Sequence, residues 1–355
     1  MKTIAVIGTG LIGTSVALAL SRRGVTVHLQ DVDALAAKTA AALGAGTLDP
    51  PDGPVELAVI AVPPARTAAE LVAAQRAGLA AAYTDVASVK ARPGTDLTAA
   101  GGDPARYVGG HPLAGRERSG PLAADADLFA GRHWVLTPSA ATAPEVLAAG
   151  RKLAELCGAT PLIMDASAHD HAVALTSHTP HVVSSLMAGL LADTAERTVA
   201  VSGQGLRDVT RIAGGDAGLW IEILTGNAAA VAEVLEQYGA RLADAAAALQ
   251  DVRSPDPETA RRGTTALTDL LRLGERGYAR VPRKLAGLVT VEVTVPDRPG
   301  ALARLLTAAA EAGINVEDVR IEHLPDRAAG HVKLQVSQDA AAGFTELLRA
   351  HGWPT

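Results

Sequence analysis

Apolar β-like runs and helix-period segments alternate along the first 165 residues. The runs TIAVIG, VTVHLQD, VELAVIAVP, AAYTDVAS, RHWVLTP and ATPLIMDA are separated by stretches such as LIGTSVALALSRRG and APEVLAAGRKLAELCG. Strands that alternate with helices are typical of a parallel sheet with helices on both faces. Residues 1–165 are therefore predicted to form an α/β domain.

Two further changes of pattern divide the rest of the chain. Residues 166–287 lack β-like runs and are alanine-rich with helical periodicity, which predicts an all-helical domain with short breaks at glycines. Residues 288–355 read as LVTVEVTVP, a DRPG turn, ALARLLTAAAEAG, INVEDVRIEH, HVKLQVS and AAGFTELLRAHG. This β-α-β-β-α order predicts a small α+β domain in which HGWPT stands where a closing strand would follow.

Composition narrows the class of protein. Thirty-eight acidic and 32 basic side chains give a net charge of −6, which argues against a nucleic-acid partner. Cys157 is the single cysteine, so an intramolecular disulfide framework is excluded, and we expect a buried, inert thiol in a reducing compartment. The first apolar run is too short for a signal peptide, and no run of about 18 apolar residues occurs. We therefore expect a cytoplasmic protein that does not span a membrane.

The motif GTGLIG carries the first chemical signal. Gly8, Gly10 and Gly13 follow the strand-like IAVI and open a helical segment, as in a turn that receives a pyrophosphate at a helix N-terminus. Asp31 ends VTVHLQD, where an acidic group accepts from an adenosine ribose hydroxyl and repels a 2′-phosphate. Val32 and Asp33 add no arginine, so NAD is favoured over NADP. The alternative is a glycine turn that only packs the helix.

GHPLAGRERSG, residues 110–120, carries the second signal. Its glycines and Pro112 predict a loop, and His111 on such a loop can take a proton near neutral pH if a neighbour fixes its tautomer. Ser88, in TDVASVK with Asp85 and Lys90, is a candidate for that neighbour. The alternative is a loop histidine bound by backbone groups, and Ser119 remains open as a helix cap.

The helical region adds histidines and arginines. His169, His171, His178 and His181 cluster in AHDHAVALTSHTPH, but no cysteine joins them and no HExxH spacing occurs, so no metal is expected. In GLRDVTRIAGGD, Arg207 and Arg211 are spaced i, i+4, which predicts one helix face that receives carboxylates. On the alternative reading, these arginines pair with Asp208 or Asp216 at the surface.

The ordered motifs GTGLIG, TDVASVK, GHPLAGRERSG, SHTPH and RDVTRIA resemble the prephenate/arogenate dehydrogenase family of tyrosine biosynthesis. PDRPGAL and AGINVEDV resemble an ACT regulatory domain. The resemblance implies a Rossmann-type dinucleotide-binding domain over 1–165, a helical substrate and dimerisation domain over 166–287 and an ACT-like, ferredoxin-like domain over 288–355. It also implies a homodimer and the NAD-dependent oxidative decarboxylation of prephenate to 4-hydroxyphenylpyruvate, or of arogenate to tyrosine.

The resemblance also implies roles for individual residues. His111 is expected to be catalytic with Ser88 as its partner, and Arg211 to hold a substrate carboxylate. Residues expected to bind substrate are Arg211, His181, His178, Glu117, Ser177 and Arg207. Residues expected to bind NAD are Gly8, Gly10, Leu11, Ile12, Gly13, Asp31, Val62, Pro63 and Ser88. Residues expected to bind tyrosine or another aromatic effector are Asp297, Arg298, Pro299, Gly300 and Asn315.

Three alternatives stay open at this point. Arg116 adds a cation to the histidine loop where many relatives have a small or neutral residue, so prephenate and arogenate are not separated by the sequence. A β-hydroxyacid dehydrogenase would normally need a catalytic lysine that HDHAVALTSHTPH lacks. A non-catalytic sensor of NAD and an amino acid is disfavoured by the joint presence of His111, Ser88 and Arg211.

Overall fold

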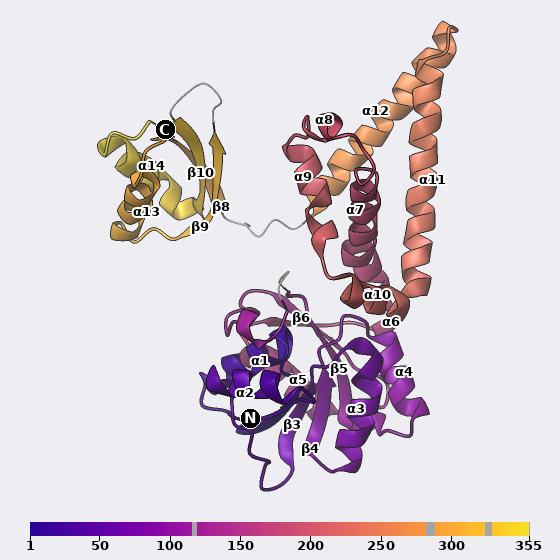
Figure 1. The fold of residues 1–355 in the computed structure, drawn as a ribbon, viewed down its shortest axis with the longest axis vertical. Helices are drawn as coiled ribbons and strands as arrows, with labels where there is room; N and C mark the ends of the chain where they lie inside the picture. The colour runs from indigo at the N-terminus through magenta and orange to yellow at the C-terminus, as the bar shows by residue number, and fades with distance from the viewer. Residues whose placement is uncertain (116–118, 282–287, 324–328, 355) are drawn as a thin grey trace. The chain divides into compact units, whose positions relative to one another are not determined.

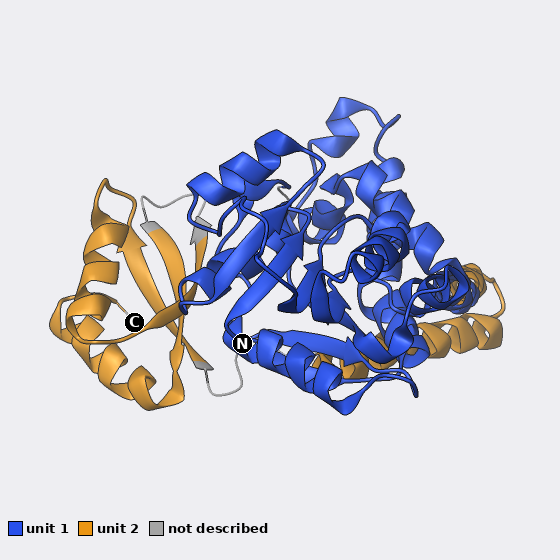
Figure 2. Ribbon diagram, turned by 90° about the horizontal axis from the view of Figure 1, so that it is seen from below, with its two compact units in different colours: residues 1–242 blue, residues 243–355 orange. Residues whose placement is uncertain are grey.

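The computed structural model describes residues 1–115, 119–281, 288–323 and 329–354. It divides into two compact units, Met1–Leu242 and Ala243–Thr355 (Figure 2). The boundary falls inside one long helix. The expected division into three domains at residues 165 and 287 therefore stays a prediction.

Seven strands form the sheet of the N-terminal region, in the order β2-β1-β3-β4-β5-β6-β7. Figure 1 labels β3, β4, β5 and β6 of this sheet. All neighbouring pairs are parallel except β5 and β6, which are antiparallel. The predicted parallel sheet is therefore confirmed, apart from this one antiparallel pair. The strands are β1 (Thr3–Ile7), β2 (Thr26–Gln30), β3 (Val55–Ile60), β4 (Ala80–Asp85), β5 (Tyr107–Pro112), β6 (His133–Thr137) and β7 (Thr160–Ile163).

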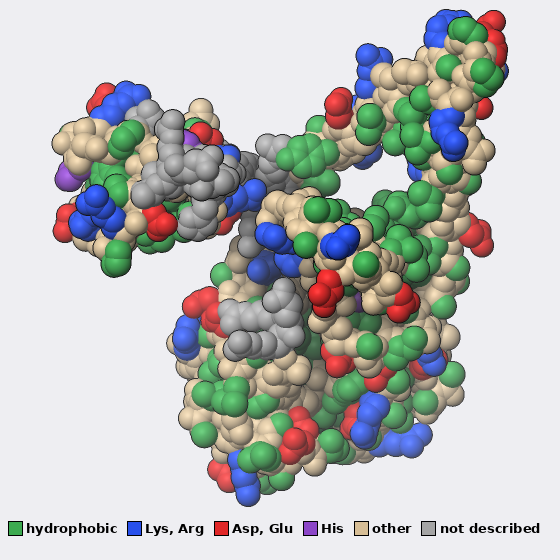
Figure 3. Space-filling model, turned by 45° about the horizontal axis from the view of Figure 1, so that its top comes forward, with side chains coloured by type: hydrophobic (Ala, Val, Ile, Leu, Met, Phe, Trp, Pro, Cys, Tyr) green, Lys and Arg blue, Asp and Glu red, His purple; other side chains and the backbone are tan. Residues whose placement is uncertain are grey.

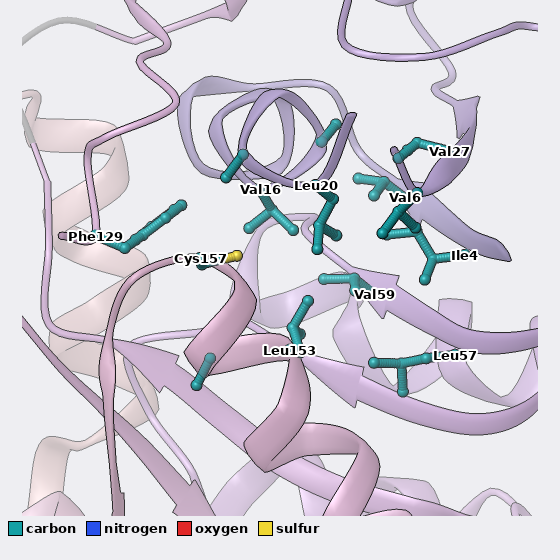
Figure 4. Close-up of a cluster of buried hydrophobic side chains, with 14 of the residues drawn as sticks. Ile4, Val6, Val16, Leu20, Val27, Leu57, Val59, Phe129, Leu153 and Cys157 are labelled. Carbon is teal, nitrogen blue, oxygen red and sulfur yellow. The ribbon is translucent and has the colours of Figure 1, made fainter. Parts of the chain in front are cut away.

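Helices cover both faces of this sheet, as expected. Figure 4 shows the core on one face, where Val16 and Leu20 of α1 approach Leu153 of α5 and the thiol of Cys157. Cys157 is buried, as expected, and burial raises the pKa of its thiol to about 12, so the sulfur stays protonated. The helices are α1 (Leu11–Ser21), α2 (Ala34–Ala42), α3 (Pro64–Arg76), α4 (Ala91–Ala99) and α5 (Pro144–Leu156), with short turns η1 (Pro104–Arg106) and η2 (Pro121–Ala123).

His111 lies in strand β5, so the prediction that it stands on a loop was wrong. The strand pairs with β6 through Pro112, but it pairs with β4 only at Tyr107 and Val108. Pro112 is therefore tolerated, because it lies at the end of the strand and β4 has already ended on its other side. Gly110 is required by packing, since a Cβ there would lie 2.5 Å from the Asp85 carbonyl oxygen.

The region after β7 is helical, as expected. A single π-helical turn, η3, joins α6 to α7, and such turns often occur at functional sites. The elements are α6 (Ala166–Val173), η3 (Ala174–His178), α7 (Thr179–Gly189), α8 (Glu196–Val199), α9 (Gln204–Thr210), η4 (Arg211–Gly214), α10 (Ala217–Gly226), α11 (Ala228–Val252) and α12 (Pro257–Arg280). In the described residues no single helix is long and apolar enough to cross a membrane; α10 and α11 pass that test only as a pair bent by 94°.

The C-terminal sheet has the order β8-β10-β9 and is antiparallel, with α13 and α14 packed on one face (Figure 1). This confirms the expected β-α-β-β-α order. In place of a closing strand, the carbonyl of Pro354 accepts a hydrogen bond of 2.8 Å from the Thr294 amide on β8. The elements are β8 (Leu288–Pro296), α13 (Ala301–Glu311), β9 (Val316–His323), β10 (Ala329–Ser337) and α14 (Gln338–Ala350).

Candidate active site

A cavity of about 300 Å³ lies at the carboxyl ends of β1 and β3. Ligands of doubly wound sheets bind in this position, where the strand order reverses. We call it the cofactor cavity; its lining is Ile7, Gly8, Gly10, Gln30, Asp31, Val32, Ala61, Val62, Pro63, Arg66 and Glu70. Five of the residues expected to bind the cofactor are thus brought together: Gly8, Gly10, Asp31, Val62 and Pro63.

The three glycines of GTGLIG have separate physical reasons. Gly8 has φ +100°, and a Cβ there would lie 2.3 Å from the Ala61 carbonyl oxygen. A Cβ on Gly13 would lie 1.9 Å from the Gly8 carbonyl oxygen, so this glycine lets α1 pack closely. Nothing lies within 4 Å of a Cβ built on Gly10. The turn therefore leaves open space before the N-terminus of α1, which fits a pyrophosphate.

The first turn of α1 contains Leu11 and Ile12. Both side chains are partly buried and pack against the hydrophobic core. Their contribution to an anion at this site therefore comes from their backbone amides, because a helix begins with amides that have no intrahelical partner.

Asp31 both organises the glycine turn and lines the cavity. Its Oδ2 accepts hydrogen bonds from the backbone amide (2.5 Å) and hydroxyl (2.8 Å) of Thr9, and its Oδ1 accepts from the Asp33 amide (2.9 Å). Burial alone would raise the pKa of this carboxyl, but these hydrogen bonds outweigh burial and lower it. Asp31 is therefore ionised at neutral pH.

Arg66 is a cation that sequence reasoning missed in this cavity. The search for an arginine was limited to the residues after Asp31, whereas Arg66 comes from α3, on a different part of the chain. Its guanidinium pairs with Glu70 at 3.0 Å and is half exposed. Both signs of charge therefore lie around the opening where a ribose would bind.

The His111 ring contacts a second histidine. His111 Nδ1 lies 2.8 Å from Nε2 of His169 on α6, and the two rings meet edge to face. Nδ1 of His169 lies 2.8 Å from Oδ1 of Asp170. Burial, reinforced by the nearby His169, Lys90 and His178, holds the pKa of His111 well below its usual value. His111 is therefore a neutral imidazole near pH 7, able to accept a proton.

Asp170 connects this pair of histidines to the sheet region. Its two carboxylate oxygens accept hydrogen bonds from the backbone amides of Lys90 (2.8 Å) and Ala91 (2.9 Å), at the start of α4. Burial alone would raise the pKa of the Asp170 carboxyl. Hydrogen bonds from His169 and from these two amides outweigh burial, so the net pKa is lowered. Asn227 donates to the Asp170 carbonyl at 2.7 Å. Asp170 is therefore an ionised, fixed acceptor.

Lys90 binds the backbone of β5 next to His111. Its ammonium is fully buried, pairs with Asp85 and donates to the Gly110 carbonyl at 2.6 Å. The hydroxyl of Tyr107 donates to the second oxygen of Asp85. A buried charge that is paired and hydrogen-bonded on several sides is fixed in place, and so is the backbone next to His111.

Two further histidines, His181 and His178, lie beside Trp220 on α10. The His181 ring stacks on the indole with centroids 3.6 Å apart, and His178 meets it edge to face at 6.3 Å. Burial lowers the pKa of both, that of His178 to about 4. His178 Nδ1 lies 3.2 Å from the Asn227 amide nitrogen, whereas His181 Nδ1 is buried with no hydrogen-bond partner among the described residues.

In the part of the chain that the structure describes, Ser88 and Ser177 form no hydrogen bond with His111. Ser88 is half-buried between β4 and α4. The side chain that contacts Nδ1 of His111 is His169. The prediction that Ser88 fixes the His111 tautomer through this nitrogen was therefore wrong. Ser177 is exposed on η3. Glu117 and Arg116 lie outside the described residues.

Arg207 and Arg211 do not share one α-helix. Arg207 is exposed on α9, which ends at Thr210, and Arg211 opens the tighter turn η4, so the expected i, i+4 helix face was wrong. The two acids suggested as partners have other contacts: Asp208 accepts from Gln204 at 2.9 Å, and Asp216 caps α10 through the Leu219 amide at 2.7 Å.

Sequence reasoning missed the roles of Asp170, Asn227 and Trp220. It noted His169 only as a possible metal ligand, and no cluster of three or more potential metal-binding side chains occurs in the described part of the chain. The adjacent pair His169-Asp170 was the available signal for a hydrogen-bonded histidine. Trp220 is one of three tryptophans, which is a weak signal.

A glycine-lined cavity at the carboxyl ends of β1 and β3, together with a neutral, buried histidine near the carboxyl end of β5 in the same sheet, is typical of a dinucleotide-dependent oxidoreductase. Residues 16–162 match the prephenate dehydrogenase nucleotide-binding domain, residues 165–259 the prephenate dehydrogenase dimerization domain, and residues 289–340 the ACT domain. A protein of Streptomyces niveus named "Probable prephenate dehydrogenase NovF" is 38% identical over 100% of this chain and 99% of its own. The chain therefore belongs to the prephenate dehydrogenase family.

Further relatives agree with this placement. The prephenate dehydrogenase of Bacillus subtilis is 26% identical over 95% of this chain and 92% of its own. The Aquifex aeolicus prephenate dehydrogenase, solved with hydroxyphenyl propionate and NAD+, has a TM-score of 0.64 and 26% identity over 77% of this chain and 98% of its own. The structure of Synechocystis arogenate dehydrogenase has a TM-score of 0.61 and 26% identity, over 76% of this chain and 99% of its own.

Proposed function

We propose that this chain catalyses the NAD-dependent oxidative decarboxylation of prephenate to 4-hydroxyphenylpyruvate, in tyrosine biosynthesis. The observation that carries the proposal is the neutral His111 at the carboxyl end of β5, in a chain that is 38% identical over its full length to a relative named as a probable prephenate dehydrogenase. NAD, once bound, supplies the acceptor for a hydride.

The chemistry needs one group that first accepts a proton and later returns it. Prephenate carries a hydroxyl on the ring carbon that loses hydride, and His111 accepts the hydroxyl proton as that hydride leaves. The bond to the ring carboxylate then breaks, carbon dioxide departs, and its electron pair makes the ring an aromatic phenolate. His111 returns the proton to this oxygen. The products are 4-hydroxyphenylpyruvate, carbon dioxide and NADH, with no net proton released.

Several side chains are proposed to hold the substrate while this occurs. Arg211 pairs with a substrate carboxylate, with Arg207 as a second cation near it in the chain. His181 offers a buried Nδ1 without a hydrogen-bond partner in the described residues, which suits a polar substrate atom. His178, Ser177 and Glu117 complete the proposed substrate set, and Ser88 is proposed to contact the substrate hydroxyl and the cofactor.

NAD is proposed to bind in the cofactor cavity with its pyrophosphate at Gly8, Gly10 and the first turn of α1. The ionised Asp31 accepts hydrogen bonds from the adenosine ribose and disfavours the 2′-phosphate of NADP. Val62 and Pro63 form the opposite wall. Leu11, Ile12 and Gly13 act through backbone amides and close packing of α1.

The assay that tests this function pairs each substrate with each cofactor. NADH formation at 340 nm is followed with prephenate and with arogenate, each with NAD and with NADP. The proposal expects the highest kcat/KM for prephenate with NAD. Arogenate as the better substrate would replace the substrate assignment, which the similarity to Synechocystis arogenate dehydrogenase makes a specific alternative. No turnover of either substrate would overturn the function.

Assembly and regulation form a second part of the proposal. The match to a dimerization domain and the exposed apolar side chains of the helical region suit a homodimer. Figure 3 shows hydrophobic side chains on the outer surface of this region, and its exposed members in the first unit include Leu186, Leu190, Leu219, Ile221, Tyr238 and Leu242. We propose a cytoplasmic homodimer with domains at 1–165, 166–287 and 288–355. Its mass by light scattering tests the dimer.

The ACT domain is proposed to bind tyrosine or another aromatic amino acid at the turn before α13. Gly300 has φ +81° and caps this helix, and Asp297, Arg298 and Pro299 are exposed beside it. Asn315 precedes β9, where its amide donates to Glu317. Inhibition by tyrosine that is lost on Asp297→Ala, with basal turnover kept, is the expected result.

A further inference from the structure

Two hydrogen bonds in series connect His111 to a buried carboxylate. The first joins His111 Nδ1 to His169 Nε2 and the second joins His169 Nδ1 to Asp170 Oδ1, each at 2.8 Å. His169 is 1% exposed, and Asp170 is held by the Lys90 and Ala91 amides, so neither residue can turn away without breaking buried hydrogen bonds.

The acceptors in this series fix where each proton lies. An ionised carboxylate can only accept, so Nδ1 of His169 carries a proton and donates to Asp170. In neutral His169 the other nitrogen, Nε2, then has a lone pair and accepts from Nδ1–H of His111. The Nε2 atom of His111 is left with a lone pair. Free imidazole side chains in water favour the opposite form, with the proton on Nε2.

We propose that His169 and Asp170 are positioning residues that hold His111 in its Nδ1–H tautomer and so keep Nε2 of His111 ready to accept a proton. This inference rests on the proposed function only for the identity of the proton donor. When His111 becomes an imidazolium during turnover, the same two residues keep their hydrogen bonds, and the Asp170 charge stabilises the cation.

Among the described residues, the titratable groups around His111 come from α6, from η3 and from the segment before α4. His169 and Asp170 come from α6, Lys90 from the segment before α4, and His178 from η3. Lys90 is occupied by Asp85 and the Gly110 carbonyl, and His178 by Asn227. Within the described residues, His169 is the side chain in hydrogen-bond contact with Nδ1 of His111.

The first experiment reads the tautomer directly and needs no substrate. Protein labelled with ¹⁵N-histidine is studied by long-range ¹H–¹⁵N correlation NMR near pH 7, and the His111 signals are identified by their loss in His111→Asn. The proposal expects the proton of His111 on Nδ1. A wild-type His111 with its proton on Nε2 overturns it. Because turnover is measured separately, failure of the proposed function is distinguishable from failure of this inference.

The second experiment uses three variants on one helix. His169→Phe keeps a ring but removes the acceptor, and kcat is expected to fall about 100-fold with KM and NAD affinity changed less than about two-fold. His169→Gln restores an acceptor oxygen and is expected to recover at least about ten-fold of that loss. His171→Phe is the matched control, because His171 is exposed and bonds to the Ser167 carbonyl, and its kcat should not change.

Two results of this series would contradict the positioning role. A His169→Phe enzyme within about three-fold of wild-type kcat means that His111 does not depend on the series. A His169→Gln enzyme no more active than His169→Phe means that the acceptor at this position is irrelevant. Urea denaturation of each variant separates these kinetic results from loss of folded protein.

Discussion

The imidazole of His181 and the indole of Trp220 stack face to face, with ring centroids 3.6 Å apart and planes inclined by 11°. The two residues come from α7 and α10, so the stack ties these helices together at the proposed substrate cleft. Gly215 makes room for it, since a Cβ there would lie 2.7 Å from the indole nitrogen. A flat, fixed imidazole next to an aromatic wall suits recognition of a planar six-membered ring.

Loss of that wall should weaken substrate binding more than chemistry. Trp220→Leu is expected to raise the KM for prephenate about ten-fold, because His181 loses the surface that fixes its ring, with NAD affinity unchanged. Trp220→Phe keeps an aromatic face and should recover most of the loss. An unchanged KM in Trp220→Leu would show that the stack has no part in binding.

His111 is expected to carry proton transfer, so its loss should reduce kcat without reducing NAD affinity. His111→Asn should lower kcat by about 10²- to 10⁴-fold, the usual range for a general base. Stopped-flow turnover and NAD titration by fluorescence measure the two effects. His133→Asn, an exposed histidine on the neighbouring strand β6, is the control. Near-normal kcat in His111→Asn would exclude the residue as base.

The same residue sets the acid limit of activity. A base must be neutral to act, so turnover is lost as pH falls through the pKa of His111, which burial and neighbouring His169, Lys90 and His178 hold well below its usual value. The pH profile of kcat/KM should therefore stay flat through pH 6.5 and fall only at more acidic pH. A fall centred at or above pH 6.5 would contradict a buried, neutral His111.

Asp31 and Arg66 together should control cofactor choice. Asp31→Ser removes the charge that repels a 2′-phosphate while Arg66 stays in the cavity, so the ratio of kcat/KM for NADP to that for NAD is expected to rise at least about ten-fold. Adding Arg66→Ala should cancel most of this gain. Asp33→Ser is the control, because Asp33 caps α2 and is not among the residues that line the cavity. Unchanged selectivity in Asp31→Ser would contradict the ribose contact.

Lys90 should matter for stability as well as for the site. Lys90→Met leaves Asp85 buried with the Tyr107 hydroxyl and the Ala87 amide but without its cation. Removing one partner of a buried ion pair typically costs about 3–5 kcal/mol, so the midpoint of urea denaturation should fall clearly. Lys152→Met, on helix α5, is the control. A midpoint equal to that of wild type would mean that water or another group compensates Asp85.

Local sequence patterns were enough to predict the cofactor cavity. Gly8, Gly10 and Gly13 act within one strand-turn-helix unit, where the backbone conformation and the close approach of α1 depend on neighbours only a few residues away. The strand that ends before Asp31 pairs directly with β1, so its place at the cavity also follows from the topology. Arg66 was missed because it arrives from α3, after a further strand.

The site around His111 depended on contacts that no local pattern contains. Glycine and proline rules predicted a loop at residues 110–112, but β6 pairs with this segment while β4 has already ended beside it. His169 is 58 residues away from His111, and the sequence offered it only as one of several histidines. Which histidine meets which is decided by packing of the helical region on the sheet, which periodicity does not encode.

The hydrogen bond from Thr294 to the carbonyl of Pro354 has a consequence for assembly. β8 is an outer strand of its sheet, and an uncovered outer strand can template pairing with another polypeptide. Proline accepts through its carbonyl but has no amide hydrogen to offer, so the segment that covers β8 cannot itself extend the ladder. At Thr294 the outer edge of β8 is therefore closed to a further strand by the residue that covers it.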